Sequence, residues 1–198
     1  GFKEEYWLNV KQQIQFKIDS DAYSGLTEAH FGLGYIKGKQ NILDNFWQRI
    51  REVYVGKEKV LLPSPEDNIV TLALHQRIFG KALCLKYTLD LALLLKKYQS
   101  AFDWDYLLRQ AREYRIASSI FFLLTPLDSF GLIPLPGSIY KGLCLPQYKK
   151  RLIARFIEKS CFTEGLIHQM KTMYLKSYLF LFDNWREPLN YVINIPRE

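Results

Sequence analysis

Alternating apolar and polar residues mark the first element that the sequence predicts. Ile14, Phe16 and Ile18 alternate with polar residues, which is the period-two pattern of a half-buried strand. Residues 19–25 are rich in turn-forming Asp, Ser and Gly, and a second apolar run follows. We therefore predict a β-hairpin over residues 13–33. Because two strands are rarely stable alone, this hairpin needs a larger sheet or helices to pack against.

Helical spacing of apolar residues begins at residues 41–50, and residues 53–62 bracket a Gly-Lys pair in the manner of a short hairpin. A stronger helix signal follows. Ser64 is a suitable N-cap, Pro65 suits the first helical position, and Gly80 is a suitable stop. The sequence therefore predicts a helix between Ser64 and Gly80.

The rest of the chain predicts further helices. Residues 83–98 are apolar nearly all round, so we expect a central helix there. Asp103 is a suitable cap for the next helix, and residues 116–124 predict a buried helix ended by Pro126 and Gly131. The Pro- and Gly-rich stretch 134–146 predicts a loop and a boundary between subregions. Helical periodicity resumes over three final segments, residues 147–160, 163–182 and 187–195. These patterns predict an α+β protein that is mostly helical.

Composition narrows the class of protein only slightly. The 198 residues are 48% hydrophobic, which suffices for a buried core. The net charge of +7 favours polyanions, but the basic residues are scattered. The three cysteines form no C-x-x-C pair, so we expect reduced thiols and a cytoplasmic location. The longest apolar runs fall well short of the roughly 20 residues that span a bilayer, so we expect no membrane partner.

Two Asp-x-Asp patterns are candidate cation sites, because paired carboxylates bind divalent cations. Asp19-Ser20-Asp21 lies in a predicted turn, and Asp103-Trp104-Asp105 begins a predicted helix. Asp is common at both places for local hydrogen bonding, and we favour those roles. The run Gly32 to Gly38 has the spacing G-x-G-x-x-x-G, which differs from phosphate-binding loops and favours a strand followed by a turn.

Glu28 and His30 lie two residues apart on the second predicted strand, which places both positions on one face. A carboxylate beside an imidazole can bind metal or move protons. A solvated strand face explains the same pattern.

A second group of titratable residues lies on two predicted helices. His75 shares a helical stripe with apolar residues, and Asp90 lies one turn after Lys86 in the most apolar helix. A buried Asp needs a partner, so we expect a structural hydrogen-bond network of His75, Lys86 and Asp90. The alternative is that these side chains face a substrate.

Basic residues gather near the start of the helix predicted over 147–160. They are Lys149, Lys150, Arg151, Arg155 and Lys159, of which the last three share one helical face. This patch is suited to phosphates. A solvated helix face is the alternative, because no base-stacking motif accompanies it.

Several phrases of the chain, taken in order, resemble one family. They are Glu28-Ala29-His30-Phe31, Phe46-Trp47-Gln48-Arg49, Leu62-Pro63-Ser64-Pro65-Glu66-Asp67, Leu72-Ala73-Leu74-His75, Leu85 to Leu95, Phe102-Asp103-Trp104, Phe182 to Arg186 and Ile193 to Pro196. This series is similar to the uncharacterised nucleotidyltransferase family of the polymerase-beta-like superfamily. In that family the phrase L-S-P-E-D opens a helix that ends in an apolar run and a histidine. A basic residue, the phrase D-L-A-L-L-L and the start of a further helix at D-W follow in that order.

The resemblance implies a protein whose N-terminal sheet carries Gly-Ser and Asp-x-Asp, with two metal-binding carboxylates and a third on a later strand. This chain shows the later strand without the Gly-Ser and Asp-x-Asp. By position Glu28 is the third carboxylate, which orients a metal or activates an acceptor hydroxyl. The expected fold is then a hairpin remnant of a nucleotidyltransferase-type sheet, residues 1–62, packed on a helical domain, residues 63–198.

Two functions are therefore expected from different classes. The first is the C-terminal part of a nucleotidyltransferase, with Glu28 and His30 at the active-site edge and His75, Lys86 and Asp90 toward the acceptor. Its substrates would be a nucleotide and an unidentified acceptor, with Mg²⁺ as the cofactor. Because this reaction requires the missing carboxylates as well, we expect the chain alone to be inactive. The alternative is a non-catalytic module that binds nucleic acid or an acidic protein through its basic helical face.

Overall fold

The computed structural model describes residues 2–6, 13–20, 23–30, 41–79, 85–160 and 180–184. The chain divides into two compact units, residues 1–49 and residues 50–198. The predicted functional division at residue 62 rests on the family resemblance and stays a prediction. The architecture is α+β and mostly helical, as the sequence predicts.

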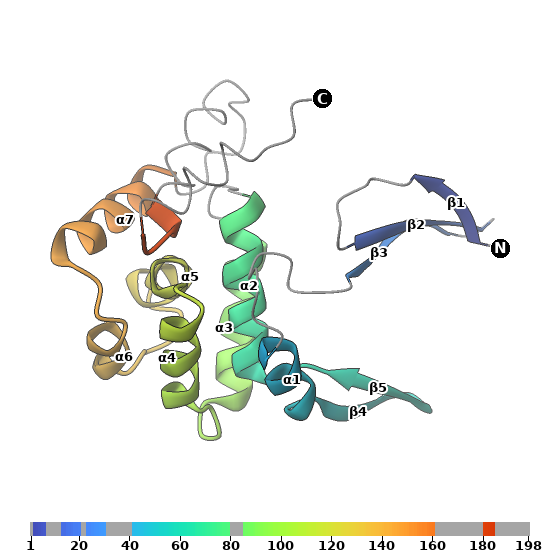
Figure 1. Cartoon of the computed structure of the whole chain (residues 1–198), viewed down its shortest axis with the longest axis horizontal. Coiled ribbons are helices and arrows are strands. Elements are labelled where there is room, and N and C mark those ends of the chain that lie inside the picture. The colour runs from blue at the N-terminus through green and yellow to red at the C-terminus, as the bar shows by residue number, and fades with distance from the viewer. Residues whose placement is uncertain are drawn as a thin grey trace. The chain divides into compact units, whose positions relative to one another are not determined.

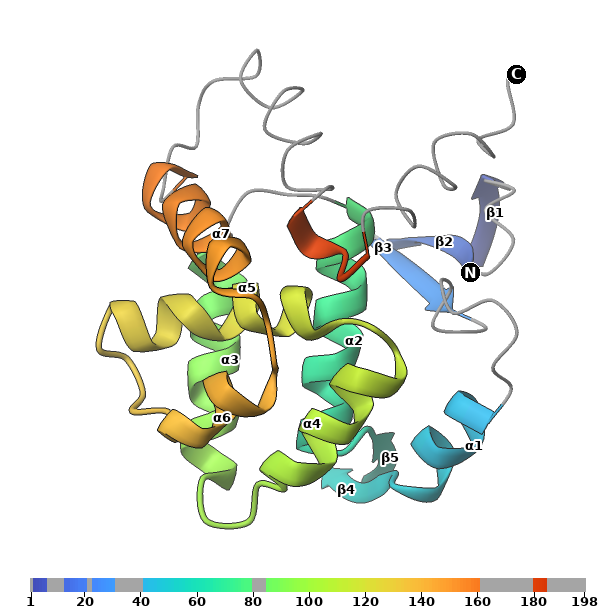
Figure 2. The same cartoon turned by 60° about the vertical axis from the view of Figure 1, so that its left-hand side comes forward.

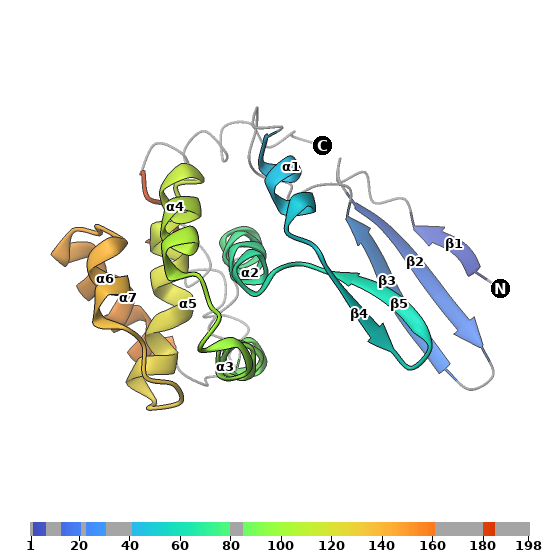
Figure 3. The ribbon, with the colours of Figure 1, turned by 90° about the horizontal axis from the view of Figure 1, so that it is seen from below.

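The first unit contains a three-stranded antiparallel sheet and one helix. Its elements are β1 (Phe2–Tyr6), β2 (Gln13–Ser20), β3 (Tyr23–His30) and α1 (Asn41–Gln48). The strand order is β1-β2-β3 (Figure 3). The predicted hairpin and the helix predicted over 41–50 are confirmed, and β1 supplies the third strand that a hairpin needs for stability.

The turn of that hairpin is shorter than predicted. Asp19 pairs with Ser24 and Ser20 with Tyr23, so residues predicted to turn belong to the strands. Polar side chains are tolerated at strand ends wherever the ladder of backbone hydrogen bonds continues. The Asp19-Ser20 part of the first Asp-x-Asp pattern is therefore strand, while Asp21 lies outside the described residues.

The second unit begins with a two-stranded hairpin. Strands β4 (Arg51–Val55) and β5 (Glu58–Leu62) pair antiparallel, with Val55 opposite Glu58. Gly56 has a φ of +64° in the connecting turn, a backbone conformation that glycine adopts at little cost. The short hairpin predicted around this glycine is confirmed.

Six helices follow in the described part of the second unit. They are α2 (Pro65–Phe79), α3 (Leu85–Tyr98), α4 (Trp104–Glu113), α5 (Ala117–Ser129), α6 (Gly137–Gly142) and α7 (Gln147–Ser160). Helix α2 contacts α3, α4 and α5, and α5 in turn contacts α7 (Figures 1 and 2). The core between them contains side chains that are at most 1% exposed, among them Ile69, Ala73, Leu91, Leu95, Leu107, Ile120, Phe122 and Leu124.

Helix α3 is not central, contrary to the sequence prediction. Leu91 and Leu95 are buried, but Leu85, Leu89 and Leu93 are 46%, 44% and 66% exposed. The reason is that α3 packs on α2 and α5 through one face, and its leucines cover the whole circumference. Composition alone does not indicate which leucines a neighbouring helix covers.

Helix α5 continues through Pro126, which was predicted to end it. Proline removes one helical hydrogen bond, at a cost of about 3 kcal/mol in a helix interior. The surrounding burial offsets this cost, since Leu124 and Leu127 are fully buried. The helix ends at Ser129, and Gly131 follows as the predicted stop signal, with a φ of +63°. The next amide, of Leu132, donates to the Leu127 carbonyl at 2.9 Å.

The stretch predicted as a loop over residues 134–146 contains helix α6. Ile139 and Leu143 are 1% and 2% exposed, so this short helix contributes to the core and does not separate subregions. The glycines and prolines predicted an irregular segment. The apolar residues Ile139 and Leu143 are four positions apart, so one helical turn places both against the core. Helix α7 confirms the prediction over 147–160. Residues 163–179 of the segment predicted over 163–182, and the whole segment predicted over 187–195, lie outside the described residues.

Candidate functional site

The start of α2 contains two adjacent acidic residues that are buried. Glu66 and Asp67 are 2% and 4% exposed. The Ser64 hydroxyl accepts a hydrogen bond from the Asp67 amide at 3.1 Å and donates to Asp67 Oδ2 at 2.6 Å. Ser64 is thus the N-cap that the sequence predicts. The carboxylate of Asp67 is held at the helix N-terminus, where the helix dipole favours negative charge.

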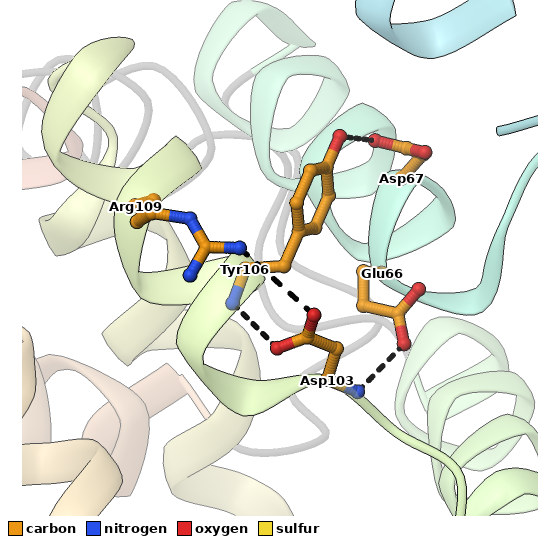
Figure 4. Close-up of polar contacts among 5 residues, drawn as sticks. All are labelled: Glu66, Asp67, Asp103, Tyr106 and Arg109. Atoms are coloured by element: carbon orange, nitrogen blue, oxygen red, sulfur yellow. Dashed lines mark hydrogen bonds and ion pairs between the residues drawn. The ribbon is translucent and has the colours of Figure 1, made fainter. Parts of the chain in front are cut away.

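Both acids also connect α2 to α4, as Figure 4 shows. The Tyr106 hydroxyl donates to Asp67 Oδ1 at 2.8 Å, and the Asp103 amide donates to Glu66 Oε1 at 2.9 Å. Asp103 itself caps α4 by accepting from the Tyr106 amide at 2.8 Å. We call these five residues, Ser64, Glu66, Asp67, Asp103 and Tyr106, the α2–α4 clamp.

The clamp is suited to a structural role. Both Asp67 oxygens accept short hydrogen bonds from side-chain hydroxyls, and one Glu66 oxygen accepts from a backbone amide. Hydrogen bonds of this kind compensate buried polar groups for the water contacts that they lose. The clamp joins two phrases of the resemblance, L-P-S-P-E-D and F-D-W, and thereby fixes the relative position of the helices that carry them.

Tyr114 lies near the clamp and is 7% exposed. Burial, together with the negative charges of Glu113 and Asp67, raises the pKa of Tyr114 to about 12. In the unfolded chain this phenol ionises near its usual pKa of about 10. The folded state therefore retains a proton that the unfolded state loses, and stability is expected to fall as the pH rises from about 10 to about 12.

Replacing Tyr114 with phenylalanine is expected to remove this part of the pH dependence, worth about 2 kcal/mol across that interval. Urea unfolding of both proteins at several alkaline pH values measures it. The exposed Tyr148→Phe variant is the matched control and should retain the slope of the parent protein. Equal slopes for the parent and for Tyr114→Phe would show that Tyr114 is not the group responsible.

A second polar contact anchors residues 180–184 to the helices. The Asp183 carboxylate accepts from the amides of Ala117 and Ser118 at 2.9 and 2.7 Å. The Ser119 hydroxyl donates to the Leu181 carbonyl at 2.8 Å, and the Lys149 amine donates to the Phe182 carbonyl. Asp183 thus caps α5 across 66 residues of sequence, and this short segment bridges α5 and α7.

Glu28 and His30, the predicted catalytic residues, lie on β3 in the first unit. In the register of the sheet Glu28 pairs with Gln15 and His30 with Gln13. The backbone therefore confirms the strand on which the prediction depends, while their side chains lie outside the described part of the structure.

His75, Lys86 and Asp90 do not form the buried network predicted for them. Asp90 and Lys86 are exposed on α3, one helical turn apart. His75 is half-buried on α2, and its ring contacts Tyr87 edge to face with the centroids 6.1 Å apart. The prediction was wrong for Asp90 because α3 is not central, so its carboxylate stays in water. Their substrate-facing role stays a prediction.

The predicted basic patch is divided by the structure. The Lys149 and Lys150 amines donate to the carbonyls of Phe182 and Tyr140, the second at 2.8 Å. Arg151 and Arg155 are exposed on α7, and Lys159 lies in the same helix. Two of the five cations therefore stabilise the fold through backbone contacts, which weakens the patch as a phosphate site.

Within the described ranges, no three or more His, Cys, Asp or Glu side chains are placed to hold a metal ion. The pair Asp103 and Asp105 begins α4, as predicted, with Asp103 as the cap. The glycine run from Gly32 to Gly38 lies outside the described residues. None of the helices in the described ranges has both the length and the apolar character that crossing a bilayer requires.

Residues 27–130, just over half of the chain, match the family model described as uncharacterised nucleotidyltransferase. The chain belongs to this family. The match starts on β3 beside Glu28 and extends to the end of α5, so it includes the α2–α4 clamp. No curated protein and no solved structure matches the chain.

Sequence reasoning missed the tertiary contacts of the α2–α4 clamp. It identified Ser64 and Asp103 as caps, but not the bonds from Tyr106 to Asp67 and from Asp103 to Glu66. The sequence did contain a signal for these contacts, because the first turn of α2 has two acids, Glu66 and Asp67. Capping the helix requires only one of them, so the other was available for a contact outside the helix.

Proposed function

We propose that this chain forms the acceptor side of a nucleotidyltransferase, which moves a nucleoside monophosphate from a nucleoside triphosphate to an acceptor hydroxyl in the cytoplasm. The observation that carries the proposal is the family match, which begins at residue 27 on β3 and continues through the helices to α5. The matched residues include both the strand that contains the candidate carboxylate Glu28 and a helical region with exposed charged groups.

Glu28 has the main chemical role in this proposal. Its carboxylate orients the triphosphate through a divalent cation or accepts the proton of the attacking hydroxyl. His30, two residues further along the strand, assists proton movement. A regular antiparallel register over eight residue pairs, from Gln13–His30 to Ser20–Tyr23, supports a well-defined position for both backbones.

Mg²⁺ is the cation that such chemistry uses, and it requires further carboxylates beside Glu28. The buried acids of the α2–α4 clamp are unsuited to supply them, because hydroxyl and amide donors already occupy both Asp67 oxygens and one Glu66 oxygen. The proposal therefore assigns Glu28 alone to the metal and leaves the remaining ligands to residues beyond those described. Without them we expect no transfer.

The helical unit provides the acceptor side. Lys86 and Asp90 are exposed one turn apart on α3 and offer a cation and an anion to a polar acceptor, with His75 on the neighbouring helix. The α2–α4 clamp contributes by holding α2 in a fixed position, which limits the entropy lost when an acceptor binds.

Substitution of Glu28 tests the proposal without knowledge of the acceptor. Isothermal titration of the complete gene product with each common nucleoside triphosphate, with and without Mg²⁺, measures the binding step. Glu28→Gln keeps the size of the side chain and removes its charge. We expect it to weaken the Mg²⁺-dependent binding by about 10- to 100-fold, and Glu158→Gln, at an exposed position of α7, to leave it unchanged.

Two results would contradict this function. One is an affinity for nucleoside triphosphates that is the same in Glu28→Gln, in Glu158→Gln and in the parent protein. The other is the absence of Mg²⁺-dependent binding for every triphosphate when thermal unfolding shows the complete product to be folded.

A further inference from the structure

An open groove lies between the end of α3, the start of α4 and the loop that follows α5. Its volume is about 400 Å³, enough for a nucleobase and its sugar. Leu95 comes from α3, Gln99 directly follows that helix, Trp104 comes from α4, and residues 133–136 complete the lining. None of the residues assigned to the proposed transfer site lines it.

Trp104 provides the groove with an aromatic surface that is held in place. Its ring centroid is 4.4 Å from that of Phe102, which is only 7% exposed. Trp104 is also the first residue of α4, directly after the Asp103 cap that the α2–α4 clamp fixes. A half-buried ring with a rigid backbone loses little entropy when a planar ligand stacks on it.

The remaining walls combine one polar group with apolar surface. Gln99 is exposed, and its amide offers a donor and an acceptor side by side, the arrangement that pairs with the edge of a nucleobase. Pro134, Leu135 and Pro136 also line the groove. A flat ring with polar edges can use both the Gln99 amide and the apolar surface of the groove, whereas an aliphatic side chain can use only the apolar surface.

Cations surround the same end of α3. Lys96 and Lys97 are exposed in its last turn. The Arg51 guanidinium is 4.6 Å from the centre of the Tyr98 ring and donates to the Pro63 carbonyl at 3.1 Å. Trp104 is flanked by two acids, of which Asp103 is 3.9 Å from Arg109 and Asp105 is exposed. Lys96, Lys97, Arg51 and Arg109 outnumber these two acids, a balance that is suited to phosphates.

We propose that the groove binds single-stranded nucleic acid. One base stacks on Trp104 with its edge toward Gln99, and the adjoining phosphates lie along Lys96, Lys97 and Arg51. This combination of stacking surface and cations is typical of proteins that bind single strands. The inference goes beyond the proposed function, because binding of a strand requires neither nucleotide transfer nor metal.

Fluorescence anisotropy with labelled oligonucleotides of about eight nucleotides, one of adenine and one of thymine, tests the groove in the complete chain without nucleoside triphosphate. Trp104→Leu keeps an apolar side chain and removes the stacking ring, so we expect affinity to fall by about 5- to 100-fold. The matched control is Trp47→Leu, at a tryptophan that is 61% exposed and outside the groove, and it should bind as the parent does.

Two exposed positions keep the test decisive should Trp104→Leu fold poorly. Gln99→Ala is expected to weaken binding by about 3- to 10-fold. Lys96→Glu should weaken it further and make the affinity less dependent on salt between about 50 and 200 mM. Lys57→Glu, at an exposed position of the β4–β5 turn, controls for the change in net charge.

Several outcomes would overturn the proposal. The first is an absence of oligonucleotide binding by the parent chain, and the second is an equal oligonucleotide affinity of the groove variants and their controls. The third is that Trp104→Leu, Gln99→Ala and Lys96→Glu abolish binding of a proline-rich peptide and leave the oligonucleotide affinity unchanged. Tight binding of a duplex with no preference for the single strand would also count against it, because stacking on Trp104 requires an unpaired base.

Discussion

Replacing Asp67 with alanine is expected to lower the free energy of unfolding by about 3 kcal/mol, the largest effect of any single substitution considered for this protein. The change removes a buried carboxylate that accepts hydrogen bonds from the Ser64 and Tyr106 hydroxyls at 2.6 and 2.8 Å. Each hydroxyl then remains buried and lacks one hydrogen-bond partner, which costs about 1–3 kcal/mol of stability for such a group. Urea unfolding followed by circular dichroism measures the change.

Two further variants make this prediction specific. Tyr106→Phe removes one of the two bonds and should cost about 1.5 kcal/mol. In the double variant the two losses should not add, because both report on the same contact between α2 and α4. The control is Asp105→Ala, an exposed acid in the first turn of α4, expected to cost below about 1 kcal/mol. If Asp67→Ala were no more harmful than this control, the clamp would not stabilise the fold.

Replacing Asp183 with alanine is the second large effect, expected to cost about 2–3 kcal/mol. The Asp183 carboxylate accepts from the amides of Ala117 and Ser118, which are 5% and 0% exposed, at the N-terminus of α5. Bonds to a charged acceptor are worth more than neutral ones, and the helix dipole adds to them. Without Asp183 the start of the most buried helix has unpaired donors.

Hydrogen exchange at the amides of Ala117 and Ser118 gives a local readout beside urea unfolding. Asp183→Asn retains an acceptor and loses the charge, so its cost should be about half that of alanine. The exposed Glu158→Ala on α7 controls for the loss of an acidic side chain. Unchanged exchange at both amides in Asp183→Ala would contradict the capping role.

Local signals in the sequence predict much of the secondary structure. The helix starts after Ser64 and after Asp103 follow from capping, in which a side chain satisfies amides two or three residues away. The β4–β5 hairpin follows from a glycine between two apolar runs. Such signals are reliable because the interacting groups are close in sequence, so few alternative partners compete for them.

The candidate site is less completely determined by the sequence. The order of motifs from Glu28 to Trp104 indicates the family, and the family match over residues 27–130 confirms it. The roles predicted for individual residues depended on which side chains are buried. The apolar composition of residues 83–98 predicted a helix buried on all sides, and this prediction was wrong. Asp90 was therefore assigned to a buried network, whereas one covered face of α3 leaves it in water.

The sequence by itself thus determined the family, the mostly helical α+β class, and the caps and turns of individual elements. Only the tertiary structure decided that Pro126 lies inside a helix, that α3 exposes Leu89 and Leu93, and which distant groups meet. The bonds from Glu66 to Asp103 and from Asp67 to Tyr106 span 37 and 39 residues. Contacts at such separations depend on how whole helices pack, because each helix position has several potential neighbours and only packing selects one.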